Sequence, residues 1–261
     1  MEKRQIALSL SYLGSAYHGY QVQSNAATVS AAVQDAVQAV VGRREEIKGC
    51  SRTDAGVHAL AFCVSFFTDS RIPLQKLPLA LNAHLPEDIR VFSARQVSEE
   101  FHPRYSCTGK AYLYRVRNAP SDSPFTRSVS WRVWPALALE PMQRAAALLC
   151  GRHDFSSFMA AHSSIAEQGG STVRTVRSFT VERHGREFWF RIEADGYLYN
   201  MVRILVGTLV EVGAGRMDPQ QMPAILASHS RSAAGPTAPA KGLALAAVYY
   251  PEFTVDGEEA L

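Results

Sequence analysis

The stretch that begins at Cys50 and reads Cys-Ser-Arg-Thr-Asp-Ala-Gly-Val-His-Ala brings together side chains that can carry chemistry. Within five positions it holds Arg52, Thr53, Asp54 and Gly56. An ionised carboxylate can act as a nucleophile or a general base, and an arginine two positions earlier shares its face if the chain is extended. Glycine allows a turn that a β-carbon would forbid. The stretch is therefore either an ordinary Asp-x-Gly turn between two strands or the loop of an active site.

A second residue stands out because of the helix predicted around it. The segment from Tyr199 to Val210 is apolar on nearly every side, which predicts a buried helix. Arg203 interrupts it, and a guanidinium group keeps its charge, so inside a buried helix it requires an anion. Either Arg203 lies on one exposed stripe with Asn200 and Gly207, or this stripe lines a cleft and the arginine faces a carboxylate or a phosphate. In the second case Asp54 is the partner we expect.

Two tyrosines, Tyr112 and Tyr114, fall on one face of a predicted strand, close to the basic residues Lys110, Arg115 and Arg117. Tyrosines in this pattern either pack against neighbouring elements or form a platform on which an unpaired base stacks, with phosphate contacts beside it. The spacing alone favours neither interpretation.

Several other kinds of site find no support in the sequence. The histidines lack the spacing of metal ligands, and there is no Gly-x-Ser-x-Gly elbow for acyl transfer. Neither a dinucleotide fingerprint nor a phosphate-binding loop is present. The Asp54 motif also lacks the second carboxylate that a two-carboxylate glycosidase uses. We therefore expect neither a metal nor a cofactor.

The composition is typical of a soluble globular protein. The chain has 261 residues, of which 47% are apolar and 20% charged, and a net charge of +3 permits nucleic-acid binding without indicating it. No signal peptide is visible, and no apolar run approaches the roughly 18 residues of a membrane span. The four cysteines lie far apart, which indicates free thiols. We expect a cytoplasmic protein without a membrane segment.

The elements that position these residues form a recognisable order in the first half. Alternation predicts a strand over residues 5–12, and helical spacing predicts a helix over residues 28–41 that ends at Gly42. Strands flank the Asp54 motif, and a helix over residues 74–84 and a strand over residues 89–97 follow. This β-α-β-β-α-β order is a split-βαβ pattern, which makes a largely antiparallel sheet covered by helices.

The second half also mixes strands and helices. Strands are predicted over residues 110–117, 172–183, 187–195 and 243–250, helices over residues 142–150 and 199–212, a short helix behind an Asp218 cap, and a loop over residues 228–241. The fold class is therefore α+β. We expect two split-βαβ-like subdomains, residues 1–106 and 107–261, with the active-site cleft between them.

The motif of residues 52–59, Arg-Thr-Asp-Ala-Gly-Val-His-Ala, resembles the active-site motif of the tRNA pseudouridine synthase A family. The similarity continues in four further segments: residues 101–112, residues 154–158, residues 200–207, and residues 241–243 with 250–251. These matches run from about residue 6 to residue 251. The resemblance implies the pseudouridine synthase fold.

The resemblance also implies an activity: isomerisation of a flipped-out uridine in the anticodon stem-loop of tRNA, without a cofactor or a metal. Asp54 acts on the ribose, as nucleophile or as base, and Arg52 and Arg203 keep it ionised. Tyr112 stacks on the uracil and Leu243 is the apolar residue of the site. Arg52 also contacts phosphate and helps to hold the target base out of the stem. A homodimer is implied, with one tRNA spanning both subunits.

Four positions depart from the family pattern. Tyr20, Ser30, Ser51 and His84 stand where tryptophan, glutamine, glycine and asparagine are usual. They leave open the detail of the RNA-contacting loop and the choice of uridines. Two other classes of function also stay open: a non-catalytic RNA-binding protein of the same fold, and a nucleoside or nucleotide hydrolase, which needs a second acid or a metal.

Overall fold

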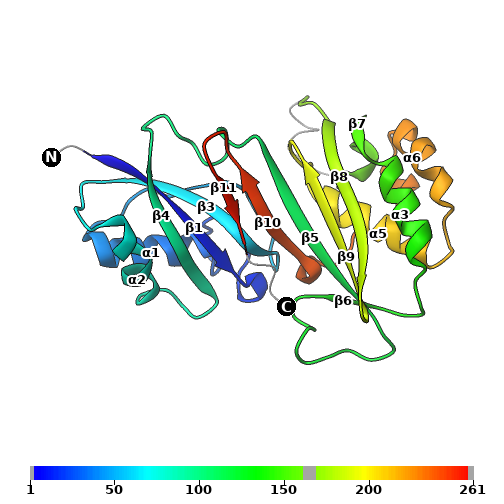
Figure 1. Cartoon of the computed structure of the whole chain (residues 1–261), viewed down its shortest axis with the longest axis horizontal. Helices are drawn as coiled ribbons and strands as arrows, with labels where there is room; N and C mark the ends of the chain where they lie inside the picture. The colour runs from blue at the N-terminus through cyan, green and yellow to red at the C-terminus, as the bar shows by residue number, and fades with distance from the viewer. Residues whose placement is uncertain (1–2, 161–168, 258–261) are drawn as a thin grey trace. The chain divides into compact units, whose positions relative to one another are not determined.

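The computed structural model describes residues 3–160 and 169–257. Internal contacts divide the chain into two units: unit 1 comprises Met1–Thr108 and Ala244–Leu261, and unit 2 comprises Gly109–Leu243. Each unit mixes strands with helices (Figure 1). The expected boundary after residue 106 lies close to this division. The closing strand differs from expectation, because all of it except Leu243 belongs to unit 1.

Unit 1 is built on a sheet with the strand order β4-β1-β3-β10. Its elements are β1 (Arg4–Tyr12), η1 (Gly14–Ala16), α1 (Val29–Val41), β2 (Lys48–Gly49), β3 (His58–Thr68), η2 (Leu74–Lys76), α2 (Leu77–Asn82), β4 (Ile89–Val97), β10 (Leu243–Tyr249) and β11 (Thr254–Asp256). Strands β1, β3 and β4 pair antiparallel, whereas β10 pairs parallel with β3. The pairings of β10 with β3 and β11 explain why the end of the chain belongs to this unit.

Strand β1 is buried on both faces, although its alternation predicted a half-buried strand. Ile6, Leu8 and Leu10 are fully buried on one face, and Gln5 is 1% exposed on the other. The Gln5 side chain donates to the carbonyl of Phe101 at 2.7 Å. The segment that follows β4 therefore covers Gln5, on the face that the sequence assigned to solvent.

Helix α1 confirms its prediction closely. The side chain of Thr28 accepts a hydrogen bond from the Ala31 amide, and Gly42 ends the helix in the left-handed conformation at φ 82°. Val33 and Val37 are buried, as the helical spacing predicted.

The strands of unit 2 follow the order β5-β9-β8-β7, and β6 pairs parallel with β5. Its elements are β5 (Gly109–Asn118), β6 (Trp131–Val133), α3 (Leu139–Leu148), β7 (Gly151–Asp154), η3 (Ser156–Phe158), β8 (Val173–His184), β9 (Glu187–Ala194), α5 (Met201–Gly213), η4 (Pro219–Gln221), α6 (Met222–Ser228), η5 (Arg231–Ala233) and η6 (Ala240–Gly242). Helices α3, α5 and α6 lie on one side of this sheet (Figure 1). The α+β class is confirmed in both units.

Strands β6, β7 and β11 were not predicted. Each has only three or four residues, which is too few for a period of two to show. The four cysteines are thiols outside any disulfide, as expected. No helix in residues 3–160 or 169–257 is long and apolar enough to cross a lipid bilayer.

Candidate active-site residues in the two units

Asp54 lies in the loop between β2 and β3, and backbone bonds fix the course of this loop. The Tyr20 amide donates to the Thr53 carbonyl at 3.1 Å, and the Val57 amide donates to the Asp54 carbonyl at 3.1 Å. The second bond closes a turn whose third residue, Gly56, has φ +76°, a value that type II turns require. The predicted turn is therefore present, with a partly exposed Asp54 at its first position.

The loop after β1 packs against the backbone of the Asp54 motif. A β-carbon on Gly14 would lie 2.0 Å from the Val57 carbonyl oxygen, and one on Gly19 would lie 2.7 Å from the Thr53 carbonyl oxygen. The Gly14 amide donates to Nδ1 of His58 at 2.9 Å. These two glycines are therefore required because two backbone segments meet without room for a side chain.

The residue before Asp54 is anchored to the end of β1. Thr53 is buried, and its Oγ1 shares a 2.7 Å hydrogen bond with the hydroxyl of Tyr12. The ring of Tyr12 in turn contacts Phe62 of β3, with ring centroids 5.5 Å apart. No pattern in the sequence indicated the Tyr12 contact, because it joins positions 41 residues apart.

Two of the four departures from the family pattern lie next to each other. The Ser30 amide donates to the Tyr20 carbonyl at 3.0 Å. Tyr20 is 5% exposed and its ring lies 4.5 Å from that of Phe62. Burial raises the pKa of the Tyr20 phenol well above its usual value. His84, in contrast, is exposed after the end of α2, and Ser51 is half-buried.

In unit 2, two hydrogen bonds hold the side chain of Arg203. Its Nε donates to the Ala238 carbonyl at 2.7 Å, and its Nη1 donates to Oδ1 of Asn200 at 2.7 Å. Gly207, one turn further along α5, is buried against the Pro236 carbonyl, since a β-carbon there would lie 1.8 Å from that oxygen. The exposed stripe considered for Arg203, Asn200 and Gly207 is therefore wrong at Gly207, because a later segment covers it.

This covering segment, residues 231–242, is here called the strap. Arg231 holds its first part together by donating to the Gly235 carbonyl at 2.9 Å and to Oγ1 of Thr237 at 3.1 Å. The Gly235 amide donates to Oγ1 of Thr208 in α5 at 2.9 Å. Burial lowers the pKa of the Arg231 guanidinium. The sequence predicted this segment as a loop, and its composition carried no sign that it supports Arg203.

The two tyrosines of β5 have different surroundings. Tyr114 is fully buried, and its hydroxyl donates to the Pro239 carbonyl in the strap at 2.6 Å, so the packing interpretation is confirmed for this residue. Tyr112 is 8% exposed, and its ring meets that of Tyr197 edge-on at 4.9 Å. Its stacking on a base stays a prediction. Leu243, 6% exposed, directly follows the strap.

The basic residues predicted around these tyrosines differ in whether they form an ion pair. Arg115 forms an ion pair with Glu187 at 2.8 Å, and both side chains are largely buried. Arg117, two residues further along β5, has no such partner among the residues described. Arg52, in the Asp54 loop, is exposed and forms no ion pair within the described ranges. Arg115 thus has a carboxylate partner, whereas Arg117 and Arg52 have none in the part of the chain that the structure describes.

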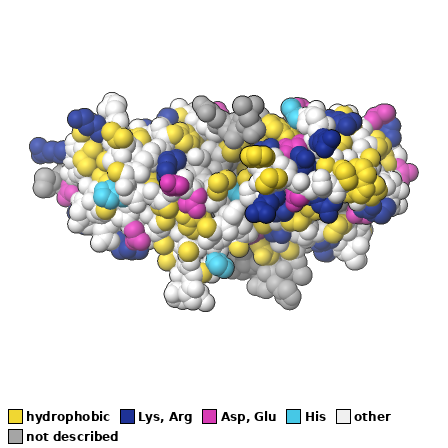
Figure 2. Space-filling model, turned by 90° about the horizontal axis from the view of Figure 1, so that it is seen from below, with side chains coloured by type: hydrophobic (Ala, Val, Ile, Leu, Met, Phe, Trp, Pro, Cys, Tyr) yellow, Lys and Arg dark blue, Asp and Glu magenta, His cyan; other side chains and the backbone are white. Residues whose placement is uncertain are grey.

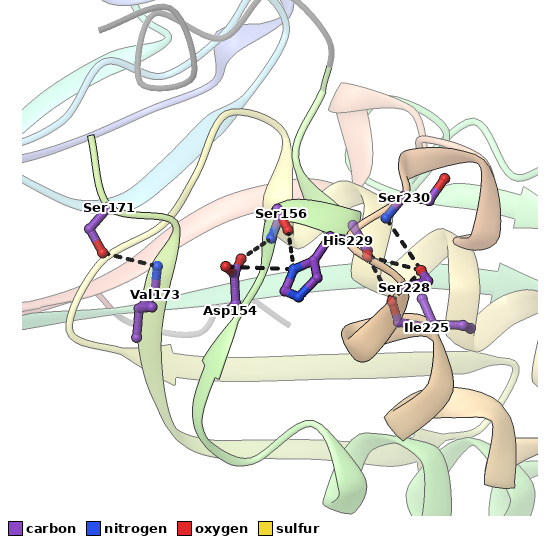
Figure 3. Close-up of polar contacts among 9 residues, drawn as sticks. Asp154, Ser156, Ser171, Val173, Ile225, Ser228, His229 and Ser230 are labelled. Carbon is purple, nitrogen blue, oxygen red and sulfur yellow. Dashed lines mark hydrogen bonds and ion pairs between the residues drawn. The ribbon is translucent and has the colours of Figure 1, made fainter. Parts of the chain in front are cut away.

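The Asp154–Phe158 signature ties β7 to the end of α6 (Figure 3). Oδ1 of Asp154 accepts a hydrogen bond from the Ser156 amide at 2.9 Å, and Oδ2 lies 3.6 Å from Nδ1 of His229. Ser157 donates from its hydroxyl to the Ile225 carbonyl at 2.7 Å. Burial of Asp154 opposes its ionisation, but hydrogen bonds, first that of the Ser156 amide, and the nearby His229 together lower its pKa. These residues therefore pack β7 against the end of α6, close to the start of the strap.

The described residues contain no group of three or more histidine, cysteine, aspartate or glutamate side chains arranged to hold a metal ion. The predicted ion pair between Asp54 and Arg203 joins residues of different units and stays a prediction. Within each unit, the structure shows that the backbone around Asp54 and the side chain of Arg203 are both fixed by specific contacts.

Comparisons with known proteins agree with these motifs. A family model described as tRNA pseudouridine synthase matches residues 9–106 and 145–251. A tRNA pseudouridine synthase A of Thermoanaerobacter sp. (strain X514) is 44% identical over 247 residues, covering 95% of this chain and 100% of the relative. The corresponding protein of Acetivibrio thermocellus is 42% identical over 247 residues with the same coverage. That of Moorella thermoacetica is 44% identical, covering 94% of this chain and 99% of the relative. The chain belongs to the tRNA pseudouridine synthase family.

Proposed function

We propose that this chain converts uridine to pseudouridine in the anticodon stem-loop of tRNA. The bond between uracil N1 and ribose C1′ breaks, the uracil turns, and a bond forms between C5 and C1′. The hydrogen lost from C5 is balanced by the hydrogen gained at N1, so the reaction needs no oxidant and no second substrate. Family membership across both units is the observation that carries this proposal.

Asp54 is the catalytic residue of the proposed reaction. Its carboxylate acts on the ribose, as nucleophile or as base, and a loop with a fixed backbone supports such a role because catalysis depends on the position of the attacking group. Arg203 is proposed as its cationic partner, since a neighbouring positive charge favours the ionised carboxylate. The bonds from Arg203 to Ala238 and Asn200 support this role by orienting the guanidinium.

The remaining site residues are proposed to bind the substrate. Tyr112 stacks on the extruded uracil, which contributes roughly 1–3 kcal/mol per stacked base. Leu243 supplies the apolar contact. Arg52, exposed and without an ion pair among the residues described, contacts a phosphate and so helps to hold the nucleotide out of its stem.

The protein is further proposed to act in the cytoplasm as a homodimer that binds one tRNA across both subunits. Light scattering on the purified protein tests the dimer: a mass of about twice 28.6 kDa is expected, and a monomeric mass at micromolar concentration contradicts it.

The activity is tested by incubating purified protein with unmodified tRNA and no added cofactor. Nucleoside analysis of the digested tRNA is expected to show pseudouridine in place of uridine. Release of free uracil would instead identify a hydrolase. Binding without any change in the nucleosides would identify a non-catalytic RNA-binding protein.

A further inference from the structure

Two arginines lie side by side at one edge of unit 2. Strand β6 pairs parallel with the end of β5, and the register places Arg117 directly beside Arg132. Partners in a β ladder project to the same face, and neighbouring strands are only about 4.8 Å apart. Two like charges on side chains that start this close together repel each other, and an anion between them removes that repulsion.

No carboxylate of the described chain compensates this pair. Glu187 is opposite Arg117 in the ladder between β5 and β9, but its carboxylate already accepts from Arg115 and, at 3.1 Å, from Nε1 of Trp189. The Nε atom of Arg117 is buried and has no hydrogen-bond partner in the described part of the protein. Arg115 and Arg117 share one face of one strand, yet only Arg115 has its counter-ion.

Two more arginines that form no ion pair among the described residues lie on segments next to β5 and β6. The carbonyl of Arg186, at the turn between β8 and β9, accepts from the Asn118 amide at 2.8 Å, which places it beside the end of β5. Arg127 belongs to the loop before β6, and its carbonyl accepts from Nζ of Lys241 at 2.9 Å. Both arginines are exposed. Arg117, Arg127, Arg132 and Arg186 are here called the arginine surface.

Exposed aromatic side chains lie on the same segment. Trp134, which follows β6, is 55% exposed, and Phe125 of the preceding loop is 90% exposed. Figure 2 views the side on which β6 and the turn between β8 and β9 lie in Figure 1, and it shows basic side chains on this side with hydrophobic and some acidic side chains between them. Asp122 is the one acidic residue between residues 119 and 135.

We infer that the arginine surface binds backbone phosphates of tRNA away from the target uridine, an inference that rests on the proposed function. Guanidinium groups bind phosphate oxygens through paired hydrogen bonds, and exposed aromatic rings accept unpaired bases. Arg117 is five residues from Tyr112 along β5, roughly 17 Å at about 3.3 Å per residue, and projects from the opposite face. One nucleotide cannot reach both, so this surface is separate from the proposed uracil site.

The test measures the affinity for full-length, unmodified tRNA at several salt concentrations. Arg117→Gln and Arg132→Gln each remove one phosphate contact and are expected to weaken binding about tenfold. Each should also flatten the slope of log affinity against log salt by about 0.7–0.9. Arg144→Gln is the matched control, because Arg144 is exposed on α3 and paired with Glu140 at 2.8 Å. It should keep the parent slope.

Thermal unfolding without RNA gives a second measurement. Because each substitution relieves repulsion between two like charges, the melting temperature of Arg132→Gln should equal or exceed that of the parent. Arg132 is exposed, so this variant carries the test even if Arg117→Gln folds poorly.

Parent affinity and slope in both variants would overturn the inference. So would equal losses in the variants and the control. The nucleoside assay on the parent protein decides the proposed function separately. A parent that makes pseudouridine while both variants bind like it refutes only the arginine surface.

Discussion

The Asp54 loop of unit 1 and the Arg203 region of unit 2 are each contacted by a segment more than 30 residues away in the sequence. In unit 1 this segment contacts the backbone, whereas in unit 2 it contacts the side chain. In unit 1, Gly19 and its neighbours contact the backbone of the Asp54 loop and so determine the position of the turn. In unit 2, the Ala238 carbonyl of the strap accepts a hydrogen bond from the Arg203 guanidinium and so determines the direction of that side chain.

This difference has a physical reason. Asp54 is short, so its carboxylate follows the backbone that carries it. Arg203 has a long and flexible side chain, whose direction is set only when its nitrogen atoms are bonded. The two regions should therefore respond differently to substitutions in their bracing segments.

Asp54→Asn should have the largest effect. It preserves the shape of the side chain and removes the negative charge that the proposed chemistry uses, so product formation should fall below detection. Binding of tRNA should be largely retained, because affinity comes mainly from phosphate contacts elsewhere. The measurement is the nucleoside assay together with a binding assay, with mass spectrometry to exclude deamidation back to aspartate. Clear turnover by intact Asp54→Asn protein would remove Asp54 from the catalytic role.

Arg203→Met tests the role of the Arg203 side chain and its hydrogen bonds in unit 2. It removes the charge and the bonds to Ala238 and Asn200, so activity should fall sharply, and the free energy of unfolding should fall by up to about 3–5 kcal/mol if the charge is paired and buried. Arg203 is only partly buried, so the lower part of this range is expected. Arg203→Lys keeps the charge without the planar fork and should restore part of the activity. Equal activity in the Met and Lys variants would show that the charge of Arg203 has no role.

Gly19→Ala tests whether the backbone contacts of unit 1 position the Asp54 loop. The new β-carbon meets the Thr53 carbonyl, so the Asp54 loop must shift, and a displacement of about 1 Å can cost roughly a hundredfold in rate. Gly42→Ala is the matched control: Gly42 also has a positive φ, but among the described residues, its two chain neighbours aside, nothing lies within 4 Å of the added carbon. Both variants should lose some stability, and only Gly19→Ala should lose kcat. A similar loss of kcat in both would mean that backbone strain, not contact with the loop, is responsible.

Asp154→Asn should have the smallest effect, a change in stability. It tests the contacts between β7 and the end of α6. The folded-state pKa of Asp154 is lowered, so its charge contributes stability above the pKa of the unfolded chain, about 3.9. This contribution is lost as the pH falls through the lower folded-state value. Acid unfolding should therefore separate parent and variant at pH 6, with the parent more stable, and the two should converge once the pH falls below the folded-state pKa of Asp154. A constant difference across this range would assign the effect to packing alone.

The sequence by itself determined the features that depend on neighbouring residues. The turn at Gly56 and the start and end of α1 at Thr28 and Gly42 follow from local conformational preferences, and all are present. The residues around Asp54 were also enough to indicate the family, to which the chain belongs.

Tertiary structure decided which of two similar residues is paired, covered or exposed. Arg115 and Arg117 look alike in the sequence, but only Arg115 meets the carboxylate of Glu187. One of the two interpretations placed Gly207 on an exposed stripe, but the strap, about 30 residues later in the chain, covers it. Strand β10 pairs with β3 across roughly 185 residues. Helical and strand periods report one segment at a time, whereas these contacts depend on which distant segments meet, and that is settled when the whole core packs.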